Sequence, residues 1–266
     1  AGNDMVLAPR RLKEEMDAVL EAVEKGELPE EEINAKCRKV LTYKYILGLE
    51  RKPFVKLSGL GTRINTPQTR DLISRLNLAA ITVLNNKNDV LPLHPDLKEA
   101  AILNVGKPEE IEPFDRKMKK YTSFARFQLR KDLPEAEQQK LRDSLAAYRR
   151  VIVTVTEQRL APYQSFFAKF APESPVIYVF YTPAKSMLQI QRAVSAAEAV
   201  VLAHASRDDV QERVADLLFG KATADGRLSA SIGGLFPTGS GVTITPHTCL
   251  LYTSPTHETS AHLVCR

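Results

Sequence analysis

Three residues near position 206 have the side-chain types of a nucleophilic triad. His204, Ser206 and Asp208 lie within five positions, at the end of an apolar run that predicts a strand. In a working triad the nucleophile, the base and the orienting carboxylate come together from separate parts of the fold. Residues this close at one strand end cannot converge in that way. We therefore interpret Ser206 as the N-cap of the next helix and His204 as a strand-end residue.

Other side chains that could hold a metal or a cofactor lack the spacing that this chemistry needs. His94 and His247 are isolated from further ligands. Gly106 follows an apolar run, but no Gly-x-Gly-x-x-Gly pattern surrounds it, which argues against a dinucleotide site. The cysteines are too few and too irregular for a disulfide framework or a metal cage; they are Cys37, Cys249 and Cys265. The sequence predicts neither a cofactor nor a metal.

The composition excludes several classes of protein. The chain has 266 residues, 44% of them hydrophobic and 26% charged, and its net charge is +5. These values exclude a wholly disordered chain, a collagen and a coiled coil. The positive charge is not clustered, so we predict no nucleic-acid partner. No apolar run approaches the roughly 20 residues of a membrane span. The chain starts at Ala1 without a signal peptide, and we expect both of its ends to be cut ends.

The N-terminal part predicts a strand end and two helices. Residues 1–7 are typical of the end of a buried strand that runs into a loop. Apolar side chains from Met16 to Val23 form one helical stripe, and Gly26 ends this helix. A second helix runs from Pro29 to Gly48, with acidic residues in its first turn. Cys37 lies on its apolar stripe, which favours a small buried side chain over a reactive thiol.

The rest of the chain alternates between strand and helix patterns. Residues 50–66 show no periodicity, which predicts a linker, and a helix at about 67–79 follows. Apolar runs that suit strands buried on both faces then appear at 100–105, 123–129, 150–156, 175–181 and 198–205. Amphipathic helices separate them, and one has an aromatic stripe that we interpret as core rather than as a sugar platform: Tyr163, Phe166 and Phe167. The sequence predicts an α/β fold with a doubly wound, mainly parallel sheet sandwiched by helices.

Four stretches, taken in order, carry a family resemblance. They are AGNDMVL (1–7), KGELPEEEINAKCRKVLTYKYILGL (25–49), AAITVLNNKNDVLPL (79–93) and LLFGKATADGRLSAS (217–231). Together they make about residues 1–245 resemble the back half of a glycoside hydrolase family 3 enzyme. The first two stretches resemble the last strand and the closing helices of that family's catalytic (β/α)8 barrel. The last two resemble the entry and the end of its second domain.

The resemblance implies a truncated protein. A complete (β/α)8 barrel needs roughly 250 residues, so residues 1–49 would hold only its C-terminal remnant, with its last strand and helices. Residues 50–66 would be the linker, and residues 67–248 the α/β sandwich domain of the family. Residues 249–266 are expected to be non-native.

This expectation about the tail comes from its coding. Residues 249–266, CLLYTSPTHETSAHLVCR, lack helix or strand periodicity. The first six can be encoded by TGTCTCTTATACACATCT, which resembles a transposase adapter used in sequencing libraries. We therefore predict a sequencing artefact, which continuous genomic reads through the tail would refute. The alternatives are a natural tail and a Cys/His metal site, although the spacing matches no zinc pattern.

The resemblance also implies the chemistry of a retaining glycosidase. A carboxylate attacks the anomeric carbon and an acid protonates the leaving oxygen. The family's nucleophilic Asp belongs to the barrel strand that would precede Ala1, so no residue of this chain inherits that role. The β-glucosidase branch takes its acid Glu from a long loop of the second domain. Here that loop is short and Glu157 is its only acid, so Glu157 is a candidate acid, against a solvated carboxylate at a helix start.

Two further residues are candidate substrate contacts. Asn3 and Asp4 would end a barrel strand, where the sites of such barrels open. The alternative is that Asp4 bonds the backbone or a neighbouring strand within the barrel.

The short loop favours the β-N-acetylglucosaminidase branch, whose Asp–His pair lies on a barrel loop. We predict a fragment of an exo-acting β-glycosidase that hydrolyses terminal β-linked sugars and is inactive by itself. The alternatives are a β-glucosidase of the same family, a non-catalytic α/β binding module, and a flavodoxin-like protein, whose phosphate-loop glycines are absent. The expected partners are a carbohydrate substrate and the chain's own barrel domain. Family precedent favours a periplasmic or secreted bacterial enzyme.

Overall fold

The structure is a computed structural model that describes residues 2–51, 56–94, 100–170 and 175–246. The chain divides into two compact units, residues 1–65 and residues 66–266. The tail predicted to be non-native lies outside the described residues, as does His247.

The first unit is helical. Helix α1 runs from Leu12 to Glu24 and helix α2 from Glu30 to Ile46. Gly26 and Gly48 follow these helices with φ angles of 72° and 71°, a conformation in which glycine ends a helix without strain. The 3₁₀ turn η1 (Leu49–Arg51) and the short helix α3 (Leu60–Ile64) lie in the stretch predicted as a linker without periodicity.

Two predictions for this unit are wrong. The strand predicted over 1–7 is absent from residues 2–7, which are irregular. A strand needs a partner for its backbone groups, and the described part of this unit contains none. Cys37, which we expected to be buried, is exposed. None of the described residues of α2 is buried, so this unit forms no core around the Cys37 side chain. The barrel remnant assigned to residues 1–49 therefore stays a prediction.

The second unit contains one mixed sheet of six strands in the order β1-β6-β5-β4-β2-β3. The strands are β1 (Thr82–Asn86), β2 (Ala100–Val105), β3 (Ala125–Leu129), β4 (Arg150–Val155), β5 (Val176–Phe180) and β6 (Ala199–Leu202). Strand β1 pairs with β6 in antiparallel fashion, and the other neighbouring strands pair in parallel. This arrangement confirms the predicted α/β fold with a mainly parallel sheet.

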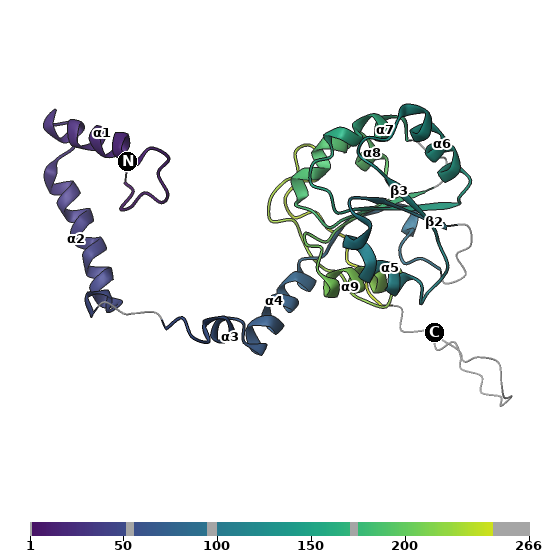
Figure 1. Cartoon of the computed structure of the whole chain (residues 1–266), viewed down its shortest axis with the longest axis horizontal. Helices are drawn as coiled ribbons and strands as arrows, with labels where there is room; N and C mark the ends of the chain where they lie inside the picture. The colour runs from purple at the N-terminus through teal and green to yellow at the C-terminus, as the bar shows by residue number, and fades with distance from the viewer. Residues whose placement is uncertain (1, 52–55, 95–99, 171–174, 247–266) are drawn as a thin grey trace. The chain divides into compact units, whose positions relative to one another are not determined.

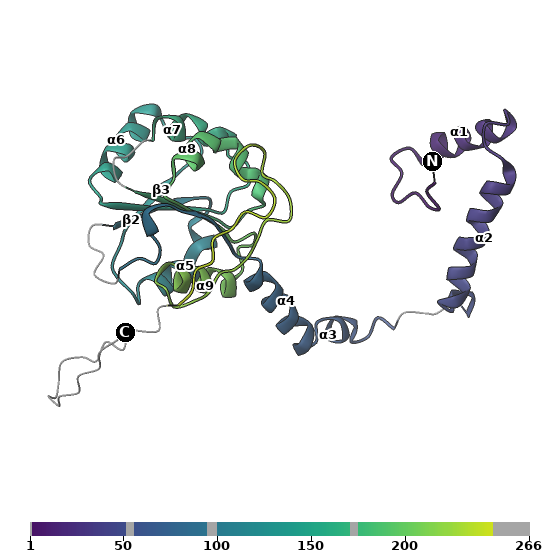
Figure 2. The ribbon, with the colours of Figure 1, turned by 180° about the vertical axis from the view of Figure 1, so that it is seen from behind.

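Helices cover both faces of the sheet (Figures 1 and 2). One face is covered by α5 (Glu112–Met118) and α9 (Asp208–Leu218). The other face is covered by α6 (Glu135–Ala146), α7 (Gln164–Lys169) and α8 (Gln191–Ala196). Helix α4 (Pro67–Ala79) packs against α9. The two layers of helices confirm the predicted sandwich.

Short 3₁₀ turns connect several of these elements: η2 (Lys87–Asp89), η3 (Pro108–Ile111), η4 (Ala161–Tyr163) and η5 (Ala184–Ile190). The helix predicted between the apolar runs at 175–181 and 198–205 is split between η5 and α8, because Ile190 has the non-helical angles φ −130° and ψ 35°. Within the described ranges, we find no helix that is both long enough and apolar enough to cross a membrane.

The sheet separates two apolar cores. In β4, Ile152 faces the core under α5 and α9, whereas Val153 faces the core under α6, α7 and α8. Both side chains are fully buried, which explains why this run is apolar at successive positions. The aromatic stripe of Tyr163, Phe166 and Phe167 is buried in the second core, as we interpreted it.

The start of α9 differs from its prediction. Its N-cap is Arg207, whose side chain makes no capping hydrogen bond, so Ser206 is not the cap. The Ser206 hydroxyl instead donates to the Glu110 carbonyl at 3.2 Å, and Gln211 Nε2 donates to the same hydroxyl at 3.2 Å. Ser206 therefore ties α9 to the segment before α5.

A hydroxyl–carboxylate hydrogen bond joins α4 to α9. Ser74 Oγ donates to Asp209 Oδ2 at 2.5 Å. Burial by itself raises the pKa of Asp209, but the Ser74 hydroxyl and Arg207 outweigh burial and hold this pKa below its usual value. A carboxylate whose pKa is lowered by folding stabilises the fold above its unfolded pKa and loses this contribution as the pH falls through the folded pKa.

We expect Ser74→Ala to lower the free energy of unfolding by about 1 kcal/mol at pH 7, because a partly exposed charged hydrogen bond is lost. The difference from the unsubstituted chain should shrink as the pH falls below about 4, where Asp209 takes up a proton. Urea unfolding across this pH range measures it. Ser144→Ala is the control, since the Ser144 hydroxyl bonds the Lys140 carbonyl and no carboxylate. A difference that does not change with pH would contradict the assignment.

Candidate functional site

The strand order creates a switch point between β2 and β4. Helix α5, which follows β2, packs on one face, and α7, which follows β4, packs on the other. The loops that leave these two strands therefore diverge at the carboxyl edge of the sheet. In open α/β sheets, ligands bind in the crevice outside such a switch point. The residues at this edge are therefore the candidate site.

Gly106 and Thr156 fill the space between these two strand ends. Gly106 has a φ angle of 143°, and a Cβ atom added there would overlap Thr156 Oγ1. A side chain at position 106 would thus be both strained and blocked. The close approach of the two strands explains the glycine. Thr156 Oγ1 is buried and has no hydrogen-bond partner among the described residues.

Glu157 follows Thr156 and points into its own turn. Its backbone N–H shares the Val105 carbonyl with the Thr156 N–H, at 3.2 and 3.0 Å. Its carboxylate Oε1 accepts from the Arg159 N–H at 2.9 Å. The partly buried carboxylate therefore serves as the cap of a short turn.

Gln189 on η5 holds this turn from the outside. Its Oε1 accepts from the N–H groups of Leu160 and Ala161, at 2.8 and 3.1 Å. Its Nε2 donates to the Gln158 carbonyl at 2.8 Å. One side chain thus satisfies three backbone groups of residues 158–161. The turn after β4 is short and braced, with no long loop that could carry an acid away from the sheet.

Tyr181 follows β5 at this edge and faces the core under α5, the helix that carries Asp115. Burial and the negative charge of Asp115 raise the pKa of the Tyr181 phenol well above its usual value. Burial likewise raises the pKa of Asp115, although Arg126 Nη1 lies 2.8 Å from Asp115 Oδ2. Within the described chain, neither the Tyr181 hydroxyl nor Asp115 Oδ1 has a hydrogen-bond partner. Tyr181 is therefore a neutral hydroxyl at pH 7 and a poor proton donor.

The known proteins to which this chain is similar are enzymes that act on glycosides. No family model matches the sequence. Over 104 residues, the chain is 31% identical to the lysosomal β-glucosidase of Dictyostelium discoideum. The aligned part is 39% of this chain and 12% of that protein. The structure of β-glucoside phosphorylase BglX bound to 2FGlc is similar with a TM-score of 0.57 and 19% identity, over 85% of this chain and 43% of that one. The chain resembles the C-terminal part of a glycoside hydrolase family 3 enzyme.

Two further structures share the fold. One is a family 3 β-N-acetylglucosaminidase from Paenibacillus sp. str. FPU-7, with a TM-score of 0.55 and 19% identity over 85% of this chain and 44% of that one. The other is a β-glucosidase from Listeria innocua in complex with isofagomine, with a TM-score of 0.51 and 16% identity over 80% of this chain and 34% of that one. The chain spans less than half the length of each of these proteins. The family 3 likeness thus concerns the fold and includes both kinds of enzyme.

The predicted substrate contacts lie in the first unit. Lys39 Nζ donates to Asp4 Oδ2 at 2.5 Å, and this hydrogen bond lowers the pKa of the exposed Asp4 carboxyl. Asp4 therefore pairs with a side chain of α2. Asn3 is exposed. Asn3 and Asp4 lie in the first unit and Glu157 lies in the second. The sugar contacts assigned to Asn3 and Asp4 stay predictions.

The triad-like residues have separate surroundings, as their sequence spacing indicated. His204 adopts a φ angle of 63° directly after β6 and lines a pocket, whereas Ser206 bonds the Glu110 carbonyl. Asp208 opens α9. Among the described residues, no group of three or more His, Cys, Asp or Glu side chains could hold a metal ion. Sequence reasoning missed the pocket because its lining comes from distant parts of the chain.

Proposed function

We propose that this chain is the C-terminal part of a retaining, exo-acting β-glycosidase of the β-N-acetylglucosaminidase type, which hydrolyses terminal β-linked sugars. The observation that carries the proposal is the short turn after β4. The family resemblance implies that a β-glucosidase takes its acid from a long loop at this place. Here the Glu157 carboxylate caps its own turn, and Gln189 braces the residues that follow. The acid would then come from the barrel, and the α/β unit would support it.

Exposed apolar side chains in the first unit support a missing barrel partner. Met16 and Leu20 on α1 are 57% and 59% exposed, and Leu41 on α2 is 56% exposed. Helix α1 has an amphipathic stripe, and none of the described residues of either helix is buried. Apolar stripes of this kind normally pack against a neighbouring layer. The barrel of the same protein is the body that we propose for them.

The chemistry of such an enzyme needs two carboxyl groups. One attacks the anomeric carbon, and the other gives its proton to the leaving oxygen and then activates water. We propose that neither group lies in this chain. The α/β unit would then have a structural role. Its turn after β4, which Gln189 holds, would keep one conformation at the carboxyl edge of the sheet. A non-catalytic α/β binding module is the alternative from another class.

A β-glucosidase of the same family is the second candidate, because Glu157 does lie at the switch point of the sheet. The test uses the uninterrupted reading frame that contains these residues, expressed as one protein. We expect faster hydrolysis of an aryl β-N-acetylglucosaminide than of the matching aryl β-glucoside. The purified 266-residue chain should leave both substrates intact, and its hydrolysis of either would contradict the proposal.

Glu157→Gln in that full protein separates the two branches. We expect kcat/KM to stay within about threefold of the unsubstituted enzyme, since Glu157 would not be the acid. Loss of a general acid would instead cost about 10²–10⁴-fold with poor leaving groups and little with a dinitrophenyl leaving group. Glu137→Gln, at an exposed glutamate of α6, is the matched control. A large, leaving-group-dependent loss at Glu157 alone would favour the β-glucosidase type.

A further inference from the structure

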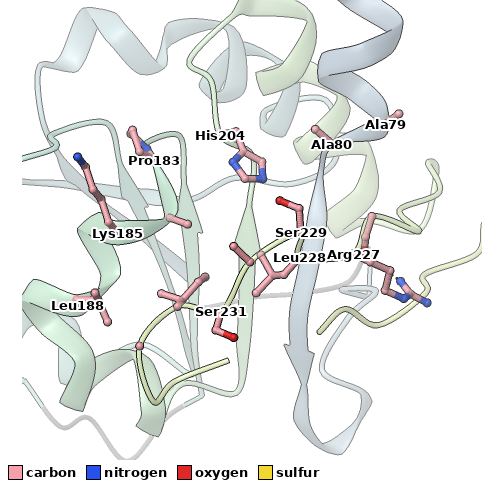
Figure 3. A pocket seen from close by; sticks show the side chains of 15 residues that line it. Ala79, Ala80, Pro183, Lys185, Leu188, His204, Arg227, Leu228, Ser229 and Ser231 are labelled. Carbon is pink, nitrogen blue, oxygen red and sulfur yellow. Dashed lines mark hydrogen bonds between the residues drawn. The ribbon is translucent and has the colours of Figure 1, made fainter. Parts of the chain in front are cut away.

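A pocket of about 590 Å³ opens at the carboxyl ends of β5 and β6, beside the start of β1 (Figure 3). Its lining comes from the end of α4, the start of η5, His204 and residues 226–233, which we call the pocket loop. Its volume lies within the range of about 300–1,000 Å³ that is typical of small-molecule sites. The pocket lies wholly in the second unit.

Two glycines fix the pocket loop against its neighbours. A Cβ atom on Gly226 would lie 2.5 Å from the Ile81 carbonyl oxygen. A Cβ atom on Gly233, which has a φ angle of 51°, would lie 2.7 Å from Leu188 Cδ2. The loop therefore approaches β1 at one end and η5 at the other more closely than a side chain allows. These two contacts fix both ends of the pocket loop.

Three polar side chains of the lining are left for a ligand. His204, Ser229 and Lys185 make no hydrogen bond or ion pair with the other residues that the structure describes. In Figure 3, His204 and Ser229 are drawn in the middle of the lining residues and Lys185 to one side. Partial burial lowers the pKa of His204, so its imidazole is neutral at pH 7 and can both donate and accept.

The charge of the lining is positive. Lys185 and Arg227 contribute cations, none of the described lining residues is acidic, and the imidazole of His204 is the one aromatic ring among them. Arg227 is held in place by the Asp225 and Gly226 carbonyls and by Thr243 Oγ1, at 3.0, 3.0 and 2.7 Å. Lys185 is exposed, and its flexible stem can bring the ammonium group over the pocket. A lining that has cations and no acid among its described residues favours an anion.

We propose that this pocket binds a small polyhydroxylated anion, that is, a monosaccharide with one phosphate or carboxylate group. Lys185 pairs with the anionic group, and Ser229 and His204 bond the sugar hydroxyls. The apolar part of the lining, including Leu188 and Leu228, contacts the carbon face of the ring. This site is separate from the turn at Glu157, and its occupation needs no glycosidase activity.

Calorimetric titration of the 266-residue chain tests the site directly. The probes are glucose 6-phosphate, glucuronate, glucose and inorganic phosphate. We expect at least one of the two anionic sugars to saturate with a Kd below about 1 mM, and glucose and phosphate to bind at least about tenfold more weakly. The better of the two anionic sugars identifies the phosphate or the carboxylate as the group that is recognised. Backbone amide shifts in labelled protein should then change at His204 and in the pocket loop.

Two variants and a control locate the contacts. Lys185→Gln should raise the Kd for the anionic sugar about tenfold and leave that for glucose unchanged. Ser229→Ala should weaken both about threefold, since one neutral hydrogen bond is lost. Lys221→Gln removes the charge of an exposed lysine outside the lining and should change neither.

Three results would overturn the proposal. The first is no saturation by either anionic sugar up to about 10 mM. The second is equal affinity for glucose and its phosphate. The third is an equal loss from Lys185→Gln and Lys221→Gln, which would indicate only diffuse attraction. Because binding is read without turnover, none of these results bears on the proposed glycosidase.

Discussion

Phe180→Ala should lower the free energy of unfolding of the second unit by about 3–5 kcal/mol, as large aromatic deletions in closed cores do. Phe180 is the last residue of the central strand β5 and is fully buried. Its ring stacks on Tyr178 with 6.0 Å between the ring centroids. Neighbours on both sides of β5 hold it, since Val155 and Leu202 are its partners in β4 and β6. Deleting the ring leaves a cavity that these strands cannot close.

Urea unfolding followed by circular dichroism measures this loss. Phe180→Leu should cost roughly 1–2 kcal/mol, because it keeps most of the apolar volume. Phe127→Ala on the edge strand β3 is the control, since Phe127 is only partly buried and packs edge-on against Tyr148. We expect about half the loss there. Equal losses at positions 180 and 127 would mean that β5 is not the centre of the core.

Periodicity carried the prediction of this fold because both sides of each central strand are buried. A strand such as β4 shows its environment in its own residues, as Ile152 and Val153 do. The antiparallel pairing of β1 with β6 was not predicted, since it depends on where the chain returns and not on any local pattern. The cap at Ser206 was mispredicted for a similar reason. Its hydroxyl donates a hydrogen bond to the Glu110 carbonyl, which is distant in the sequence.

In the first unit, the sequence pattern predicts the helices but not what they pack against. Its stripes predicted two helices correctly, but an amphipathic pattern says only that one face avoids water. It does not say which body covers that face. Cys37 lies on such a stripe and is exposed in the structure. Its burial could not be derived from the residues of this unit.

The candidate site was predictable only in part. Glu157 could be singled out because it is the only acid of the loop after residues 150–156, the loop from which, by the family resemblance, a β-glucosidase takes its acid. The hydrogen bonds that occupy its turn, above all those from Gln189, join residues about 30 positions apart, at 160 and 189. The pocket at His204 joins segments from residues 79 to 233. Spacing rules do not extend over such distances, and only the folded sheet brings these residues together.

Gly226→Ala is the second substitution with a large expected effect, because it tests how the pocket loop is held. Two parts of the chain after α9 lie beside β1: Gly226 at its start, and Val242, whose N–H donates to the Val83 carbonyl at 2.7 Å. An added Cβ at position 226 would lie 2.5 Å from the Ile81 carbonyl oxygen and 2.6 Å from Thr82 Oγ1. The backbone oxygen cannot rotate away, so the loop must move off the strand.

We expect this displacement to lower the free energy of unfolding by about 3 kcal/mol, at the upper end of what overpacking costs. The loss should be accompanied by faster hydrogen exchange of the Val242 amide, whose bond to β1 would lengthen. Gly234→Ala is the matched control, because nothing lies within 4 Å of a Cβ there and its φ is not in the left-handed region. That variant should change stability by less than about 0.5 kcal/mol. If both variants proved equally stable, the loop would not be packed against β1, and the pocket would lose its fixed wall.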